Sequence, residues 1–185
     1  MTVSGSFRLD GKVALVTGAS AGLGAAIAIG LAEVGADVAC HGNSRSPDRT
    51  AASVAQAGRA SFAVRGDLSL PETPERVIAE VIARFGRIDI LINNAGTIRR
   101  APAADYPLAD WNTVIQVNLT SLFQLSQLAG RDMIRPPGWV RSRVPVCASI
   151  SRQSSCERRT SGTYSGPSPT ASRVILVSPW VDPYG

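Results

Sequence analysis

The sequence predicts an α/β protein with a doubly wound parallel sheet in three layers, α/β/α. Two observations predict this fold. Short apolar runs alternate with helical patterns over residues 8–134, and consecutive parallel strands need helical crossovers of about 10–15 residues. A glycine-rich turn also joins the first of these runs to the first helical pattern. From residue 135 the alternation stops, so we expect a sheet that is incomplete on its C-terminal side.

Four expected strands are short and apolar at their centres, as strands buried on both faces of a parallel sheet require. They are Lys12–Thr17, Asp37–His41, Ser61–Val64 and Ile88–Ile92. The last of these has the sequence IDILI and gives the clearest strand pattern in the chain. Glycine or polar residues follow each run and mark the turn into the next helix.

Helical periodicity predicts the elements between the strands. In the helix expected at Gly22–Val34, the large apolar residues share one face, formed by Leu23, Ile27, Leu31 and Val34. An alanine-rich helix ends near Gly58, and Pro71 and Pro74 open the next helix, where proline is tolerated. The longest pattern, Trp111–Met133, predicts one helix with a single apolar face. That face contains Trp111, Val114, Ile115, Leu122, Leu125 and Met133.

The net charge of +5 lies wholly in the C-terminal part of the chain. Residues 1–134 carry 12 basic and 12 acidic side chains, whereas residues 135–185 carry seven arginines against Glu157 and Asp182. A basic segment can bind the phosphates of nucleic acid. This segment lacks both lysine and interleaved aromatic residues, so we expect no nucleic-acid partner.

Hydropathy and cysteine content disfavour other classes of protein. No stretch approaches the roughly 18 apolar residues that span a bilayer, and residues 1–10 lack the apolar core of a signal peptide. Cys40, Cys147 and Cys156 form no CxxC pair, which disfavours a zinc site and a disulfide framework. We therefore expect a cytoplasmic protein without a bound metal and without a membrane partner.

Residues 135–185 differ in composition from the rest of the chain. They contain ten serines, seven prolines and seven arginines and show no helical period; only Arg173–Val177 has the pattern of a strand. A polar segment broken by proline buries too little apolar surface to order itself, so we expect an aberrant, disordered tail. The abrupt change is typical of a GC-rich gene translated out of frame. A sequencing error, a pseudogene product and a genuinely divergent terminus are the alternatives.

The turn after the first expected strand reads Thr17-Gly18-Ala19-Ser20-Ala21-Gly22-Leu23-Gly24. Gly18 permits the tight turn, Gly22 lets the backbone approach a pyrophosphate, and Gly24 lets the helix pack close to the sheet. The free N–H groups of the helix's first turn then face the anion. The strand–turn–helix context, with the spacing TGxxxGxG, predicts a Rossmann-like dinucleotide site.

Three further motifs follow in the order found in the short-chain dehydrogenase/reductase family, which the chain resembles over residues 8–134. They are Gly66-Asp67-Leu68, Asn93-Asn94-Ala95-Gly96 and Val117-Asn118-Leu119. The resemblance implies that Asp67 contacts the adenine ring, that Asn94 lies beside the cofactor's ribose and that Asn118 is catalytic. The candidate cofactor-binding residues are Gly18, Ser20, Gly22, Leu23, Gly24, Arg45, Asp67, Leu68, Asn94, Ala95 and Gly96.

Within the family the chain resembles 2-deoxy-D-gluconate 3-dehydrogenases, also called 2-keto-3-deoxygluconate oxidoreductases. Four stretches carry this resemblance: Phe7–Ser20, Asn93–Arg100, Asp110-Trp111 and Phe123–Gln127. It implies a small-molecule substrate, a sugar acid whose hydroxyl and ketone are interconverted, and homotetrameric intact relatives, an assembly not expected of this chain. Arg99 and Arg100 either bind the substrate carboxylate or lie solvated on a loop. A 3-oxoacyl-(acyl-carrier-protein) reductase, which shares the motifs, is the alternative enzyme.

The resemblance implies NAD or NADP as the cofactor, and the residues after the second expected strand leave the choice open. An acidic side chain at the end of that strand would bind the ribose 2′-hydroxyl of NAD, whereas arginine accommodates the 2′-phosphate of NADP. Cys40–Arg45 contains no acidic residue, and Arg45 favours NADP. The resemblance to the gluconate group favours NAD.

The catalytic half that the family needs has no counterpart in this sequence. In the family a tyrosine donates the proton, a lysine four residues later lowers its pKa, and an upstream serine holds the substrate oxygen. Tyr164 is followed at this spacing by Ser168, the only lysine is Lys12, and Ser149 and Ser151 lie in a serine-rich segment. A phenol titrates near about pH 10 and needs a nearby cation to act near neutrality. We therefore expect an inactive member of an oxidoreductase family, or a non-catalytic dinucleotide-binding fragment.

Overall fold

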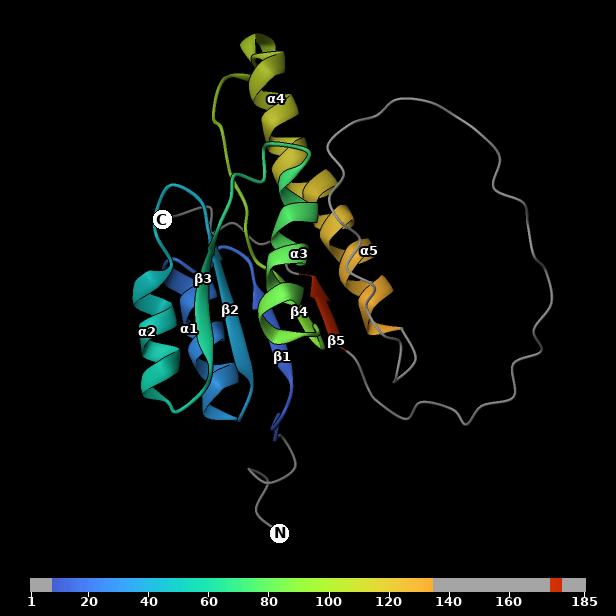
Figure 1. Cartoon of the computed structure of the whole chain (residues 1–185). Coiled ribbons are helices and arrows are strands. Elements are labelled where there is room, and N and C mark those ends of the chain that lie inside the picture. The colour runs from blue at the N-terminus through green and yellow to red at the C-terminus, as the bar shows by residue number, and fades with distance from the viewer. Residues whose placement is uncertain (1–7, 135–173, 178–185) are drawn as a thin grey trace, which may run out of the picture. The chain divides into compact units, whose positions relative to one another are not determined.

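The computed structural model describes residues 8–134 and, for the backbone, Val174–Val177. Its five strands are all parallel in the order β3-β2-β1-β4-β5, so the chain winds outward from β1 in both directions (Figure 1). This order confirms the predicted doubly wound sheet. The elements are β1 Val13–Val16, α1 Gly22–Glu33, β2 Asp37–Gly42, α2 Asp48–Gln56, β3 Ser61–Arg65, α3 Thr73–Phe85, β4 Ile90–Asn93, the 3-10 turn η2 Ala103–Asp105, α4 Leu108–Ile115, the π-helical turn η3 Gln116–Thr120, α5 Ser121–Met133 and β5 Val174–Val177.

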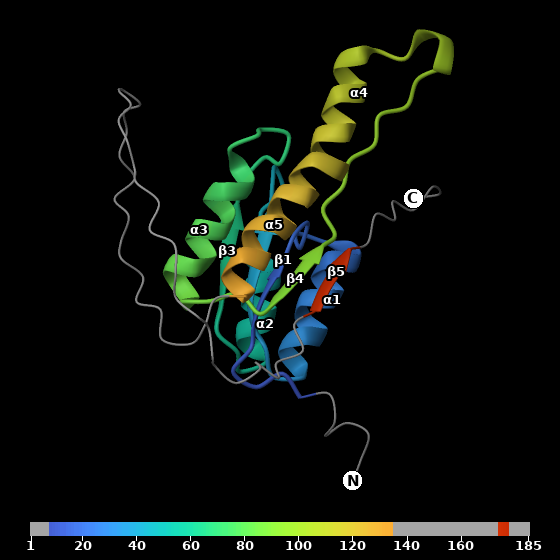
Figure 2. The same ribbon diagram turned by 90° about the vertical axis from the view of Figure 1, so that its right-hand side faces the viewer.

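Helices cover both faces of the sheet and give the three predicted layers. α1 and α2 lie on one face, and α3 and α5 lie on the other (Figures 1 and 2). Side chains alternate along β1: Leu15 packs with α3 and α5, whereas Val16 packs with α1 and α2. The side chains of β4 alternate in the same way: Leu91 packs with α3 and α5, and Ile92 packs with α1 and α2. Burial on both faces explains why these strands are almost continuously apolar.

Helix α1 presents small residues to the sheet. Gly24, Ala28 and Ala32 are its buried residues, whereas Leu23 is 59% exposed. The expectation that Leu23 lies on the inward face was therefore wrong. Hydrophobic periodicity favours large side chains, but a helix that packs close to a sheet needs small ones at the contact.

The helical pattern that predicted one element at Trp111–Met133 corresponds to α4, η3 and α5. Leu125, Ala129 and Met133 of α5 are buried as a helical face against the sheet. Trp111 is 54% exposed and no residue of α4 is buried, so its expected place in the core was wrong. Figure 2 shows the reason: α4 projects beyond the end of the sheet, where no strand lies beneath it.

Strand β5 comes from the C-terminal segment, where Arg173–Val177 has the pattern of a strand. It pairs in parallel with β4, in a register that sets Asn93 opposite Val177. The sheet thus includes a strand beyond the domain boundary predicted at residue 134. The other residues of the segment expected to be disordered, 135–173 and 178–185, lie outside the described residues.

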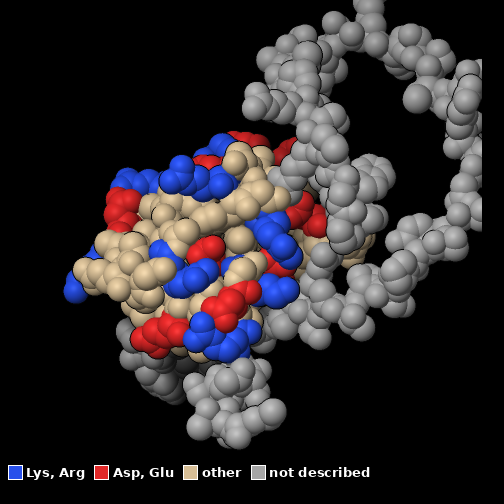
Figure 3. All heavy atoms as spheres, turned by 60° about the horizontal axis from the view of Figure 1, so that its bottom comes forward, with Lys and Arg blue, Asp and Glu red and all other residues tan. Residues whose placement is uncertain are grey.

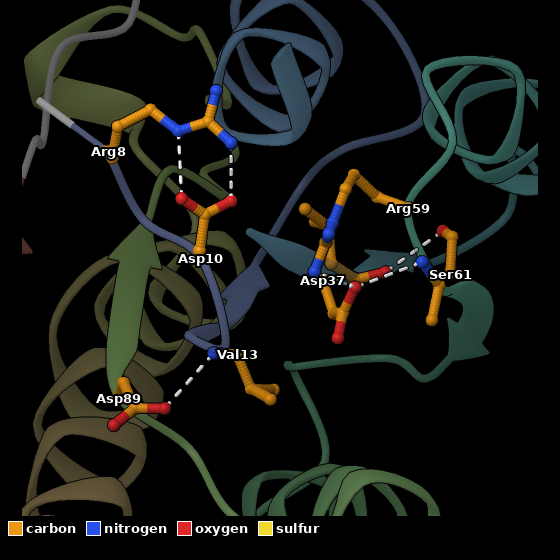
Figure 4. A network of polar contacts seen from close by, with 9 residues as sticks. Arg8, Asp10, Val13, Asp37, Arg59, Ser61 and Asp89 are labelled. Carbon is orange, nitrogen blue, oxygen red and sulfur yellow. Dashed lines mark hydrogen bonds and ion pairs between the residues drawn. The ribbon is translucent and has the colours of Figure 1, made fainter. Parts of the chain in front are cut away.

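Carboxylates hold the amino ends of the strands. Asp89, only 3% exposed, accepts a hydrogen bond from the Val13 N–H at 3.0 Å and also contacts the Arg87 guanidinium. Asp37 pairs with Arg59, the two charged groups lying 2.8 Å apart (Figure 4). Ion pairs of the protein itself therefore lie at the amino ends of the strands.

Acidic and basic side chains are interspersed on the face shown in Figure 3. Neither sign dominates this face, in keeping with the 12 basic and 12 acidic residues among residues 1–134. None of the helices in the described part of the chain is both long and apolar enough to cross a membrane.

Candidate functional site

The carboxyl ends of β1, β2, β3 and β4 surround a pocket of about 140 Å³. Its lining is formed by Gly18, His41, Asn43, Gly66, Asp67, Leu68, Ala95, Gly96 and Val117. The strand order reverses direction at β1, and ligands of open α/β sheets bind in the crevice at such a point. The structure therefore brings together residues of all four motifs that the sequence singled out, which lie far apart along the chain.

The turn between β1 and α1 has no room for side chains at two of its glycines. Gly18 has a φ of +67°, and a Cβ there would lie 2.9 Å from the Ala95 Cα. A Cβ on Gly24 would lie 2.3 Å from the Gly18 carbonyl oxygen. Gly22 also has a positive φ, +55°, but a Cβ there would meet nothing within 4 Å. Gly18 and Gly24 thus serve packing, whereas Gly22 keeps the approach to the turn open.

The N-terminus of α1 offers free backbone donors beside this turn. Its N-cap, Ala21, makes no side-chain capping bond, and the first turn holds no acidic residue. The first N–H groups of a helix lack intrahelical acceptors and favour an anion. The backbone of Gly22, Leu23 and Gly24 forms this first turn, so the exposure of the Leu23 side chain does not affect its candidate role.

Thr17 ties the end of β1 to the end of β4, and sequence reasoning did not assign it a role. Its hydroxyl is buried, accepts hydrogen bonds from the N–H groups of Asn94 and Ala95 at 3.0 Å each, and donates to the Ile92 carbonyl at 3.2 Å. A threonine at the end of an apolar strand, directly before the glycine turn, was the available signal. One hydroxyl therefore sets the relative position of two of the loops that line the pocket.

Asn94 supports the glycine turn from the other side. Its side-chain NH₂ donates to the carbonyl oxygens of Thr17 at 2.9 Å and Gly18 at 3.2 Å. The neighbouring residue Asn93 is buried and donates from its Nδ2 to the Ser126 hydroxyl at 2.9 Å. The Asn94 side chain is thus committed to the backbone of the turn, while Ala95 and Gly96 line the pocket.

Asp67 carries a negative charge into the pocket. Its Oδ1 accepts the Ser69 N–H at 2.9 Å, and this bond holds the pKa of Asp67 below its usual range, with a smaller contribution from Asn43. The carboxylate is therefore ionised at neutral pH. Leu68 is buried beside it, and its carbonyl accepts the Ser121 hydroxyl at 2.6 Å, which links this loop to α5.

Asn118 lies in the π-helical turn between α4 and α5. Its amide oxygen accepts the Thr97 N–H and its NH₂ donates to the Thr97 carbonyl, both at 2.8 Å. The side chain of the predicted catalytic residue thus holds the loop that follows Gly96. A π-helical turn of this kind is common at functional sites because it inserts one extra residue into the helix.

The two arginines considered for a substrate carboxylate lie on an exposed loop. The guanidinium of Arg99 lies 3.8 Å from the Asp110 carboxylate and donates to the Thr97 hydroxyl at 3.2 Å. Tyr106 donates from its hydroxyl to the Arg99 carbonyl at 3.1 Å. Arg100 is exposed. Neither arginine is among the pocket residues.

His41, the only histidine of the sequence, also lines the pocket, and a single histidine at a strand end is more often structural or solvated than catalytic. It is 1% exposed, and its Nε2 lies 3.1 Å from the Gly66 carbonyl, which fixes the proton on that nitrogen. Its Nδ1 has no partner. Burial lowers the pKa of His41 to about 4. The ring is thus neutral and joins β2 to the loop after β3.

We expect the free energy of unfolding to decrease as the pH falls below about 6.5. His41 titrates near 4 when folded and near 6.5 when unfolded, so the unfolded chain binds the extra proton. The loss approaches about 1.4 kcal/mol per pH unit between the two pKa values. Urea unfolding at several pH values measures this slope. His41→Gln is expected to flatten it, and an unchanged slope in that variant would contradict the assignment.

The comparisons with known proteins agree with this geometry. The family model for short chain dehydrogenases matches residues 12–150. The 2-dehydro-3-deoxy-D-gluconate 5-dehydrogenases of Bacillus subtilis (strain 168) and Dickeya dadantii (strain 3937) are 45% and 38% identical over 130 residues, 70% of this chain and 51% of each relative. The chain thus spans about half the length of the curated relatives it matches.

Solved structures give the same result. A short chain dehydrogenase from Burkholderia cenocepacia J2315 in complex with NADP has a TM-score of 0.66 and 39% identity, covering 68% of this chain and 52% of that one. A 3-oxoacyl (acyl-carrier-protein) reductase from Agrobacterium tumefaciens C58 with NADP bound has a TM-score of 0.67 and 34% identity, covering 72% and 52%. From its fold, its motifs and the family match, the chain belongs to the short-chain dehydrogenase family.

Proposed function

We propose that the described part of the chain binds NAD or NADP at the carboxyl edge of the sheet. One observation carries the proposal: the Gly18 turn packs directly on Ala95 and leaves the uncapped N-terminus of α1 beside a pocket that also contains Asp67. A pyrophosphate fits such a helix N-terminus because free N–H groups and the helix dipole both favour it. The open space at Gly22 lets the backbone approach the phosphates.

Each part of the pocket suits a different part of the cofactor. The backbone of Gly22, Leu23 and Gly24 would hold the pyrophosphate. The ionised Asp67 and the buried Leu68 would hold the adenine, since a carboxylate accepts hydrogen bonds and a leucine packs on a ring. Ala95 and Gly96, positioned by Asn94 and Thr17, would lie along the ribose. Asp67, Leu68, Ala95 and Gly96 all line the pocket, which supports the roles proposed for them.

For an intact protein of this family type, we propose a reaction that interconverts a hydroxyl and a ketone by oxidation or reduction. The nicotinamide, when bound, supplies or accepts the hydride. Asn118 would act indirectly, because its side chain fixes the Thr97 backbone. The proposed substrate is a sugar acid of the 2-keto-3-deoxygluconate type, supported by two gluconate dehydrogenase relatives at 38–45% identity. An acyl-carrier-protein reductase is the second candidate, supported by the relative from Agrobacterium tumefaciens.

We further propose that this chain binds the dinucleotide without turning over substrate. The only lysine of the sequence, Lys12, precedes β1, and its Nζ lies 3.9 Å from Asp89 at the amino edge of the sheet. It therefore stands at the opposite end of β1 from the Gly18 turn and cannot lower the pKa of a tyrosine near the pocket. Tyr164 and Ser168 lie outside the described residues.

Fluorescence titration of the purified chain with NADH and NADPH tests binding, and absorbance at the nicotinamide band with 2-keto-3-deoxygluconate tests turnover. Gly18→Ala is expected to abolish binding, because its Cβ would meet the Ala95 backbone. Gly58→Ala is the matched control, since Gly58 has a φ of +77° but nothing within 4 Å of its Cβ. The dinucleotide proposal fails if the folded chain binds neither form. The proposed inactivity fails if substrate is converted.

A further inference from the structure

Two hydrogen bonds hold the loop between β2 and α2, residues 43–47. Ser20 donates its hydroxyl hydrogen to the Arg45 carbonyl at 2.6 Å, which ties the loop to the glycine turn. Arg65 at the end of β3 donates to the Ser46 hydroxyl at 2.6 Å and holds the far side of the loop. The protein's own contacts therefore fix the conformation of this loop.

The hydrogen bond from Ser20 to the Arg45 carbonyl closes the loop over Gly42, the last residue of β2. A Cβ on Gly42 would lie 2.1 Å from the Ser20 Oγ and 2.7 Å from the Arg45 carbonyl oxygen. Both distances are far below ordinary contact, so no side chain fits. The end of this strand is where an acidic side chain binds the 2′-hydroxyl of NAD. The hydrogen bond between Ser20 and Arg45 thus occupies the space that such a side chain would need.

Residues 43–47 of the loop include a cation and an amide but no acid. The side chain of Arg45 is exposed, and Asn43, from the same loop, lines the pocket next to Asp67. A guanidinium binds a phosphate through two parallel hydrogen bonds, and it contributes little to a neutral hydroxyl. The bond from Ser20 holds the backbone of Arg45 and so fixes where this side chain leaves the loop.

We propose that the hydrogen bond from Ser20 to Arg45 makes this site select NADP over NAD, by closing the loop over Gly42. Ser20 is then a positioning residue rather than a ligand, since its hydroxyl hydrogen is committed to the Arg45 carbonyl. The inference rests on the proposed dinucleotide binding and names the form of the cofactor that the site selects.

The test compares the dissociation constants of the full chain for NADP⁺ and NAD⁺. The unmodified chain is expected to bind NADP⁺ at least about tenfold more tightly, a modest value for one charge-assisted contact. Ser20→Ala is expected to reduce this ratio about tenfold, because it weakens the binding of NADP⁺ more than that of NAD⁺. Arg45→Ala is expected to change the ratio in the same direction. A merely structural role of Ser20 would weaken both dinucleotides equally.

Ser53→Ala is the matched control, because Ser53 also donates to an arginine carbonyl, that of Arg49 at 3.1 Å, but within α2. Its ratio is expected to equal that of the unmodified chain. Thermal unfolding of each variant confirms that it is folded. Gly42→Asp alone is expected to weaken both dinucleotides, since it collides with the closed loop, and adding Ser20→Ala is expected to restore NAD⁺ binding.

The outcomes separate the two proposals. If neither dinucleotide binds the unmodified chain, the proposed function fails and the selectivity with it. If both bind equally, or if Ser20→Ala weakens both to the same extent, dinucleotide binding stands and the selecting role of Ser20 is overturned. A ratio that also falls in Ser53→Ala would overturn it as well.

Discussion

Replacing Gly24 with alanine is expected to lower the free energy of unfolding by about 3 kcal/mol and to abolish dinucleotide binding. The added methyl group would lie 2.3 Å from the Gly18 carbonyl oxygen and 2.4 Å from the Asn94 Nδ2. Overpacking of a rigid contact costs about 1–3 kcal/mol or more. Here the contact is the backbone of the turn itself, so α1 must move away from the sheet. Urea unfolding and NADPH titration measure the two effects.

Gly30 provides the control on the same helix. A Cβ there would meet nothing within 4 Å, and alanine is preferred over glycine inside a helix by about 1 kcal/mol. Gly30→Ala is therefore expected to stabilise the chain slightly and to leave binding unchanged. Equal destabilisation by both substitutions would show that Gly24 is needed for something other than close packing.

Thr17→Val is expected to lower the free energy of unfolding by about 2–3 kcal/mol and to weaken dinucleotide binding at least about tenfold. Valine has the same shape but cannot accept the N–H groups of Asn94 and Ala95, which the Thr17 hydroxyl accepts at 3.0 Å. The Asn94 N–H would keep the Ile92 carbonyl at 3.2 Å, whereas the half-buried Ala95 N–H would lose its acceptor. A donor shielded from water and left without an acceptor costs about 1–3 kcal/mol. The loop that carries Ala95 would then lose its fixed distance from the glycine turn. Urea unfolding and dinucleotide titration test both expectations.

Thr113→Val separates this effect from the substitution itself. The Thr113 hydroxyl donates to the Ala109 carbonyl at 2.9 Å within α4, on the exposed side. Its loss is expected to change the free energy of unfolding by less than about 0.5 kcal/mol. If Thr17→Val has an effect no larger than that of Thr113→Val, the hydroxyl of Thr17 does not join the two loops in the way described.

Local sequence patterns were sufficient for the strands and for the position of the glycine turn. β1 and β4 are buried on both faces, so their apolar runs stand out within a few residues. Local patterns were insufficient to predict the inward face of α1, because the residues buried against the sheet are Ala28 and Ala32 rather than the larger Leu23. They also misplaced Trp111, because nothing in the helical period tells where the sheet beneath the helix ends.

The contacts that shape the pocket join residues far apart in the sequence, and no local pattern contains them. Thr17 and Asn94 are linked across 77 positions, and Ser20 and Arg45 across 25. The motifs predicted that residues such as Asp67 and Ala95 meet at one edge of the sheet. They did not predict that the side chains of Asn94 and Asn118 bind backbone groups of neighbouring loops. Such roles depend on the hydrogen-bond partners that folding brings together.

The place of β5 in the sheet has a consequence for how the chain folds as it is synthesised. β4 and β5 are neighbours, yet Asn94–Arg173, about 80 residues, lie between them. Closing a segment of that length costs on the order of 4 kcal/mol of chain entropy. At a translation rate of about 5–20 residues per second, β4 also waits about 4–16 s for its partner to be made. During that interval the hydrogen-bonding edge of β4 is open to strands of other nascent chains.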